Sequence, residues 1–108
     1  PCFTTNGRSE FLIALARTMS LPRYDVLKNH RQGFRSIHNC FTAKDFIGFV
    51  MDYGIEKSVD NAVRLGKEFR KKEVINIIGG DGKHHHTDFE QSSRKLYNFN
   101  DRILYPCK

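Results

Sequence analysis

The sequence predicts an α+β domain of the winged-helix class: a three-helix core with a β-hairpin arm between the first two helices and a small C-terminal sheet that includes a wing. Two observations lead to this prediction. Apolar residues recur at helical spacing in three segments, and residues that favour helix caps stand beside them. Short extended patterns with turn residues lie after the first segment and after the third.

The first helix is expected over residues 9–19, because apolar side chains recur there at i, i+3, i+4 and i+7. The pattern then becomes short and extended. Strands are expected over 24–28 and 34–37, separated by a polar turn over 29–33 in which Gly33 is the one strong turn residue. This part of the chain is therefore predicted to form a hairpin arm with a basic tip.

Caps define the second and third helices. Thr42 is expected to cap the second helix, with Asp45 at the N3 position of a weakened capping box and Gly54 just beyond the C-terminal end. Ser58 is expected to cap the third. The apolar positions of the third helix are Ala62, Leu65, Gly66 and Phe69, and the cations opposite them are Arg64, Lys67 and Lys71.

Two further strands are expected after the helices. Residues 74–78 are short and β-branched and run into a glycine-rich turn over 79–82, and residues 96–99 form a second, aromatic strand. The order helix, arm, helix, helix, strand, wing, strand is a winged-helix arrangement.

With 108 residues the chain has material for one hydrophobic core, so a single domain is expected over 1–108, with its core at about 9–100. Pro1 at the first position suggests excision from a longer protein. An odd, sparse set of cysteines indicates a reducing compartment and therefore a cytoplasmic location; these are Cys2, Cys40 and Cys107. No apolar run approaches the roughly 20 residues that span a bilayer.

The net charge of +6 is concentrated in one segment, between Arg17 and Lys44. The cations of this segment are Arg17, Arg23, Lys28, Arg31, Arg35 and Lys44, and Asp25 is its one acid, so it holds +5 of the total. A local excess of this kind indicates an acidic partner.

Several of these motifs together resemble the DEP domain family. Residues 39–43 read Asn-Cys-Phe-Thr-Ala before the second helix, and the alternation over 62–69 is typical of the third helix of that family. As in that family, the third helix is followed by a strand at 74–77, and the domain ends with the aromatic strand at 96–99. The resemblance covers about residues 9–100 and implies a winged-helix, non-catalytic module that helps to place a signalling protein.

Within the family, residues 27–34 followed by 39–43 are most similar to DEP domains found upstream of a RhoGAP-like region in animal cell-division and spindle-positioning proteins. The second helix departs from many relatives. They have a Val-Asp-Trp-Leu-like run where this chain has Ile-Gly-Phe-Val at 47–50.

The leading hypothesis is that the module targets its parent protein to the plasma membrane or cell cortex by binding anionic phospholipids. The residues predicted to bind the lipid or partner are Lys28, His30, Arg31, Arg35, Arg70, Lys71 and Lys72. The alternative is a docking module for an acidic peptide or receptor tail in G-protein or Rho signalling. Exchange of the projecting arm between two chains would also give a homodimer.

Nucleic-acid binding is the less favoured alternative. A winged helix with cations along its third helix is also typical of DNA readers. Here, however, Glu68 and Glu73 interrupt the basic stripe.

Enzymatic and metal sites are not predicted. Three histidines at 84–86, with Asp81 and Asp88 nearby, suggest a metal site, but adjacent histidines in an extended loop point in alternate directions. His38 and Cys40 have no third group to orient them as base and nucleophile. The sequence therefore predicts no catalytic residue, metal or cofactor.

Overall fold

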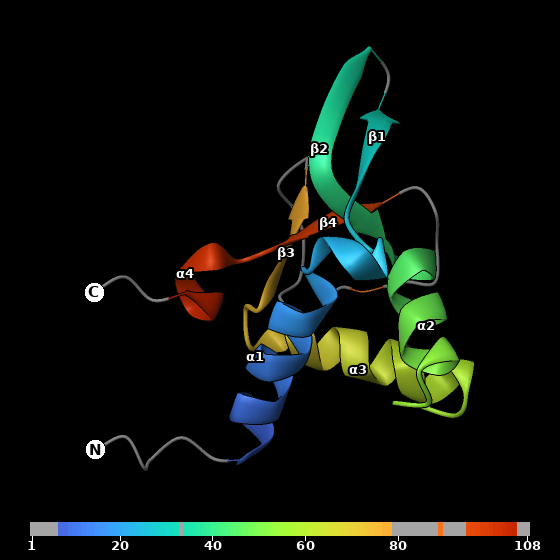
Figure 1. Ribbon diagram of the computed structural model, residues 1–108, viewed down its shortest axis with the longest axis vertical. Helices are drawn as coiled ribbons and strands as arrows, with labels where there is room; N and C mark the ends of the chain where they lie inside the picture. The colour runs from blue at the N-terminus through green and yellow to red at the C-terminus, as the bar shows by residue number, and fades with distance from the viewer. Residues whose placement is uncertain (1–6, 33, 79–88, 90–94, 106–108) are drawn as a thin grey trace.

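A computed structural model describes residues 7–32, 34–78, 89 and 95–105, with the side chains of Gln32 and Arg35 outside the description. The predicted wing turn at 79–82 and the histidines at 84–86 also lie outside it. The helices are α1 (Gly7–Met19), the 3₁₀ helix η2 (Pro22–Tyr24), α2 (Ala43–Asp52), α3 (Val59–Lys71) and α4 (Asp101–Leu104), and the strands are β1 (Lys28–Gln32), β2 (Arg35–Thr42), β3 (Ile75–Ile78) and β4 (Leu96–Phe99). This α+β, winged-helix-like arrangement confirms the predicted fold class (Figure 1).

The four strands form one antiparallel sheet in the order β1-β2-β4-β3. The outer part of β2 pairs with β1, and its last two residues, Phe41 and Thr42, pair with Tyr97 and Leu96 of β4. The sequence predicted an arm and a C-terminal sheet. The structure joins the two, because the eight-residue strand β2 belongs to both.

The predicted limits of the arm were wrong. Residues expected in the turn lie in β1, whose last residue, Gln32, pairs with Arg35, so β1 reaches further along the chain than the sequence pattern indicated. Tyr24, expected in a strand, is the last residue of η2, and the C-cap residue Asp25 has the left-handed conformation (φ 54°). Both faces of a projecting hairpin are in contact with water, so its strands can consist of polar residues. The alternation of apolar and polar residues that marks a half-buried strand is therefore missing.

A β-bulge lies where the arm leaves the core. Lys28 pairs with Cys40 and His30 pairs with Ile37, so β2 has one residue more than β1 between these pairs. Within that stretch Asn39 is left-handed (φ 55°), and its N–H donates to Oδ1 of Asn29 at 3.4 Å. A bulge bends and twists a strand. This bend contributes to the angle at which the arm extends from the core (Figure 1).

The predicted caps of α2 and α3 are confirmed. The Thr42 side chain accepts from the Asp45 N–H while the Asp45 carboxylate accepts from the Thr42 N–H, which is a complete capping box. Gly54 follows α2 with φ 72°, and the Ser58 hydroxyl accepts from the Asn61 N–H. α1 is described from Gly7, two residues before its predicted start.

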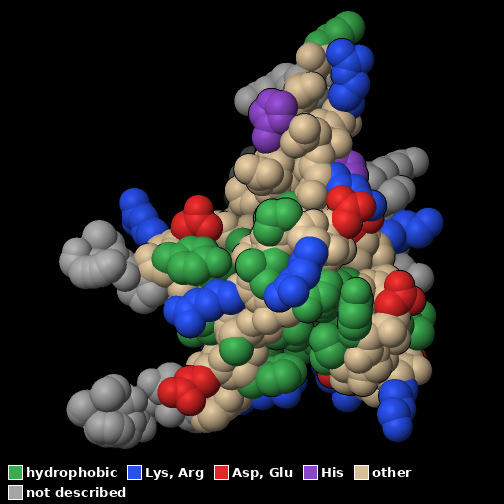
Figure 2. Space-filling view, viewed as in Figure 1, with side chains coloured by type: hydrophobic (Ala, Val, Ile, Leu, Met, Phe, Trp, Pro, Cys, Tyr) green, Lys and Arg blue, Asp and Glu red, His purple; other side chains and the backbone are tan. Residues whose placement is uncertain are grey.

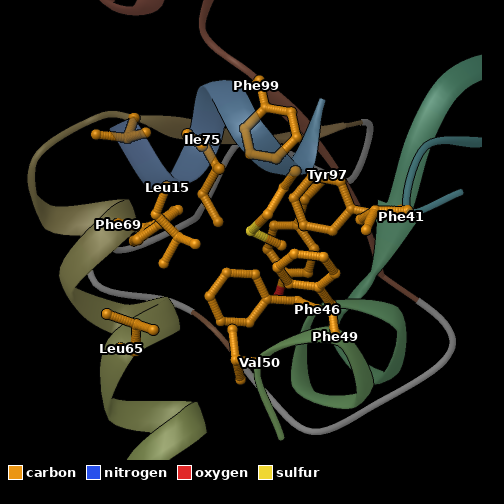
Figure 3. Close-up of a cluster of buried hydrophobic side chains, with 14 of the residues drawn as sticks. Leu15, Phe41, Phe46, Phe49, Val50, Leu65, Phe69, Ile75, Tyr97 and Phe99 are labelled. Carbon is orange, nitrogen blue, oxygen red and sulfur yellow. The ribbon is translucent and has the colours of Figure 1, made fainter. Parts of the chain in front are cut away.

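Aromatic rings fill the core between the helices and the sheet. The ring of Phe46 lies 5.2 Å from those of Phe69 and Phe89, and Phe41 lies 4.9 Å from Phe99 (centroid distances). Figure 3 shows side chains from three helices and three strands converging there, namely Leu15, Phe41, Phe46, Phe49, Val50, Leu65, Phe69, Ile75, Tyr97 and Phe99. The core therefore fixes the position of Phe41, from which β2 continues into the arm.

The basic arm as candidate functional site

The arm, defined as β1, β2 and the turn between them, extends along the longest axis of the molecule and away from the helices (Figure 1). Residues 28–42 include Lys28, Arg31 and Arg35 and contain no Asp or Glu. Arg31 is exposed on β1, and Arg35 opens β2. The backbone thus brings the arm cations together on one hairpin, as the sequence predicted.

At the turn, Phe34 is fully exposed. Figure 2 shows a hydrophobic side chain at the end of the arm, with Lys or Arg side chains next to it. Sequence reasoning placed Phe34 inside a strand and assigned it no role. The signal that could have found it is the Gly33-Phe34 pair after a polar run, because a two-residue hairpin loop leaves its side chains at the end of the hairpin.

At the base of the arm, Asp45 faces two of the predicted binding residues. Its carboxylate oxygens lie 3.8 Å from Nζ of Lys28 and 3.6 Å from Nε2 of His30. Asp45 also accepts the N–H of Thr42 in the capping box. Lys28 and His30 therefore share an acid that is already part of the start of α2, and Arg31, further out on the arm, is the more available cation.

Two other cations of the basic segment have intramolecular contacts. Arg17 donates from Nε to the carbonyl oxygen of Leu104 at 2.7 Å, and its guanidinium lies 5.7 Å from the Tyr105 ring centroid. Arg23 lies 5.4 Å from the centroid of Tyr24. The charge that the sequence places in one segment is thus divided in space, and Arg17 serves to hold α4 against α1.

The end of α3 forms a separate basic site, and one of the three residues predicted there is buried. Arg70 was expected at the surface, but it is 8% exposed and its Nη1 donates to the carbonyl oxygen of Ile75 at 3.3 Å. It is positioned to hold the chain where α3 leads into β3. Lys71 and Lys72 are exposed, and they lie on the other side of the core from the arm tip (Figure 1).

A groove of about 310 Å³ lies beside the base of the arm, between η2 and α2. Tyr24, Phe49 and Tyr53 line it, with ring centroids 4.7 to 5.5 Å apart. Tyr53, the C-cap residue of α2, is 59% exposed. The charged residues of the groove are Asp25, Lys28, Lys44, Asp45 and Asp52, so its charge is mixed.

Cys40 is buried at the base of the arm, where its Sγ lies 3.5 Å from the carbonyl oxygens of Lys28 and Ile37. Burial raises the pKa of the Cys40 thiol, which favours the neutral form over the nucleophilic thiolate. Among the residues that the structure describes, no group of three His, Cys, Asp or Glu side chains is placed to hold a metal ion. None of the described helices is long and apolar enough to cross a membrane.

The helices, the arm and the C-terminal hairpin define the chain as an α+β domain of winged-helix-like form. A family model described as the domain found in Dishevelled, Egl-10, and Pleckstrin (DEP) matches residues 26–99, which is more than half of the chain. The chain belongs to the DEP family. The matched range contains the arm, α2, α3 and the sheet, and it starts after α1. No curated protein matches the chain.

DEP domains are in general non-catalytic modules that bind membranes or signalling partners. This general role agrees with a site made of projecting charge and exposed side chains. The RhoGAP-associated subgroup stays a prediction.

Proposed function

We propose that the domain attaches its parent signalling protein to anionic membrane surfaces through the arm. The observation that carries the proposal is the hairpin of residues 28–42, which projects from the core and holds three cations and no acid. Membership of the DEP family supports a membrane surface as the destination. The plasma membrane or the cell cortex as the particular destination follows from the predicted resemblance to DEP domains of cell-division proteins.

The size of the charge sets the strength of this attachment. A Lys or Arg near an anionic leaflet contributes about 1 kcal/mol, so Arg31 and Arg35 together give about 2 kcal/mol, while the charge of Lys28 is offset by Asp45. That free energy corresponds to roughly a thirtyfold enrichment at the surface. The expected attachment is weak, reversible and sensitive to salt, because the Debye length is only about 10 Å at 0.1 M.

The test is sedimentation with vesicles of phosphatidylcholine, with and without phosphatidylserine. We expect the protein to sediment with the anionic vesicles alone and to be released by salt. The double variant Arg31→Glu and Arg35→Glu should abolish sedimentation. Sedimentation of this variant at the level of the original protein would contradict the proposal.

A matched control has the same net charge as the arm variant. In Arg64→Glu with Lys67→Glu the two changes lie on α3, across the core from the arm tip, and vesicle binding should stay largely intact. Lys71→Glu with Lys72→Glu tests a second contact at the end of α3. A large loss in either control, with arm variants unaffected, would assign binding to α3 instead.

Protein docking is the second candidate function, and the aromatic groove beside α2 favours it. Exposed aromatic side chains such as Tyr53 are typical anchors for a peptide, whereas the mixed charge of the groove does not select an acidic one. Tyr53→Ala should leave vesicle sedimentation unchanged if the arm is the membrane site. Loss of sedimentation in Tyr53→Ala would place the groove, and not the arm, in contact with the vesicle.

A further inference from the structure

The exposed ring of Phe34 is not used by the charge argument. Phe34 lies in the turn between β1 and β2, and its side chain is fully exposed at the end of the arm. A strand rises about 3.3 Å per residue, so Gln32 at the end of β1 lies about 13 Å from Lys28 at its start. The turn lies beyond Gln32, so the backbone of Phe34 is further from the core than that of Lys28 or Arg31.

We propose that Phe34 inserts into the interfacial layer of the bilayer after the arm cations have drawn the tip to an anionic membrane. This inference rests on the proposed function. The cations and the ring then have different roles: Lys28, Arg31 and Arg35 attract the arm to the headgroups, and Phe34 slows its departure by removing apolar surface from water.

The shape of the tip favours a bilayer over a folded protein as the surface that Phe34 contacts. A typical protein interface covers about 800 Å² on each partner, and an aromatic anchor there needs a matching pocket. A two-residue turn with one aromatic ring offers far less area. A bilayer needs no matching pocket, and its anionic headgroups complement the acid-free hairpin.

The chain contains no Trp, so Phe34→Trp creates a protein with a single Trp, whose emission can be excited separately from that of the tyrosines. The exposure of Phe34 means that this substitution should leave the fold unchanged. With vesicles containing phosphatidylserine, we expect its emission to shift to shorter wavelength and to be quenched by lipids that carry a shallow nitroxide. The matched control is Phe11→Trp on α1, at the opposite end of the molecule from the arm, where Phe11 is 42% exposed. Its emission should not change.

A second measurement uses Phe34→Ala. Loss of one buried aromatic side chain should weaken binding to anionic vesicles about tenfold or more. The remaining binding should disappear at a lower salt concentration than that of the original protein, since it depends on charge alone.

The outcomes separate this inference from the proposed function. If the original protein fails to bind anionic vesicles, both are wrong. If it binds, but the Phe34→Trp variant shows neither a shift nor quenching, insertion is overturned while attachment through charge stands, and Phe34 is left free for a protein partner. A spectral shift in the Phe11→Trp control equal to that of Phe34→Trp would likewise overturn insertion by the tip.

Discussion

In the core, Phe46 of α2 is fully buried and its ring packs against those of Phe69 and Phe89, whereas in the arm Phe34 is fully exposed. The strand β2 runs through both regions, and its residues are buried in the core but mostly exposed in the arm. The core derives its stability from aromatic packing. The side chains of the arm lie mostly in water and make few packing contacts, so substitutions on its surface should have little effect on the fold. Four predictions test this division.

The largest effect is expected for Phe46→Ala. Truncating a fully buried Phe costs about 3–5 kcal/mol of the free energy of unfolding, because a cavity replaces its ring contacts. Phe34→Ala should change the same quantity by no more than about 0.5 kcal/mol. Urea denaturation of both variants measures the difference. Comparable losses at the two positions would mean that the arm packs as part of the core.

Two helical glycines give the next effect. A Cβ atom at Gly66 would clash with the ring of Phe89, so Gly66→Ala should overpack the core and cost about 1–3 kcal/mol. At Gly48, facing the groove, a Cβ meets nothing within 4 Å, and Gly48→Ala should stabilise α2 by about 0.5–1 kcal/mol. Opposite shifts in thermal midpoint are expected. Shifts of the same sign would contradict the assigned packing of Phe89.

At the junction between arm and core, Thr42→Ala should cost about 1 kcal/mol, because it removes the hydroxyl that accepts the Asp45 N–H at the start of α2. Thr42→Ser keeps this hydroxyl and serves as the control. Urea denaturation should place Thr42→Ser much closer to the original protein than Thr42→Ala. Equal losses in both variants would indicate that the methyl group, and not the cap, is responsible.

The smallest effect concerns the surface of the core, where Arg8 of α1 donates to both carboxylate oxygens of Glu68 of α3 at 2.7 and 2.6 Å. These hydrogen bonds lower the pKa of Glu68. Because the pKa is lower in the folded state, the pair stabilises the fold above the unfolded-state value of about 4.3, and this contribution is lost as the pH falls through the folded-state pKa.

For an exposed pair the contribution is about 0.2–1 kcal/mol. Glu68→Gln should therefore be less stable than the original protein at neutral pH and should approach it near pH 3. The urea midpoints of both proteins at the two pH values are the measurement. A gap that is the same at both would exclude Glu68 as the titrating group. The arm variant Arg31→Glu should show little effect on stability at neutral pH.

Local chemistry explains which parts of the fold could be predicted from the sequence. Thr42, Gly54 and Ser58 act on backbone groups within three or four residues, so their roles can be recognised without knowledge of the tertiary fold. The strands of the arm could not be delimited in this way. They have little core to face, so hydrophobic alternation is missing and the polar residues of β1 were taken for a turn.

The candidate site depended more on tertiary contacts. Arg70 is buried because its guanidinium donates to a carbonyl group of β3. Arg17 is engaged by α4, a helix that the sequence pattern did not predict. Counting charges along the chain therefore identified a hairpin that projects from the core but overestimated the number of available cations. The exposure of Phe34 depends on the length of the turn, which the sequence pattern overestimated.

Thr42 is both the last residue of β2 and the N-cap of α2, so no connecting segment separates strand from helix. Changes in chain length are consequently tolerated very differently along this stretch. An insertion near residue 42 would displace the helix from its cap. At the outer end, one residue removed from each strand would shorten the arm and turn its tip to the opposite face, and two removed from each would restore the original face. The reach of the arm can thus change in steps of two residue pairs while the helices stay in place.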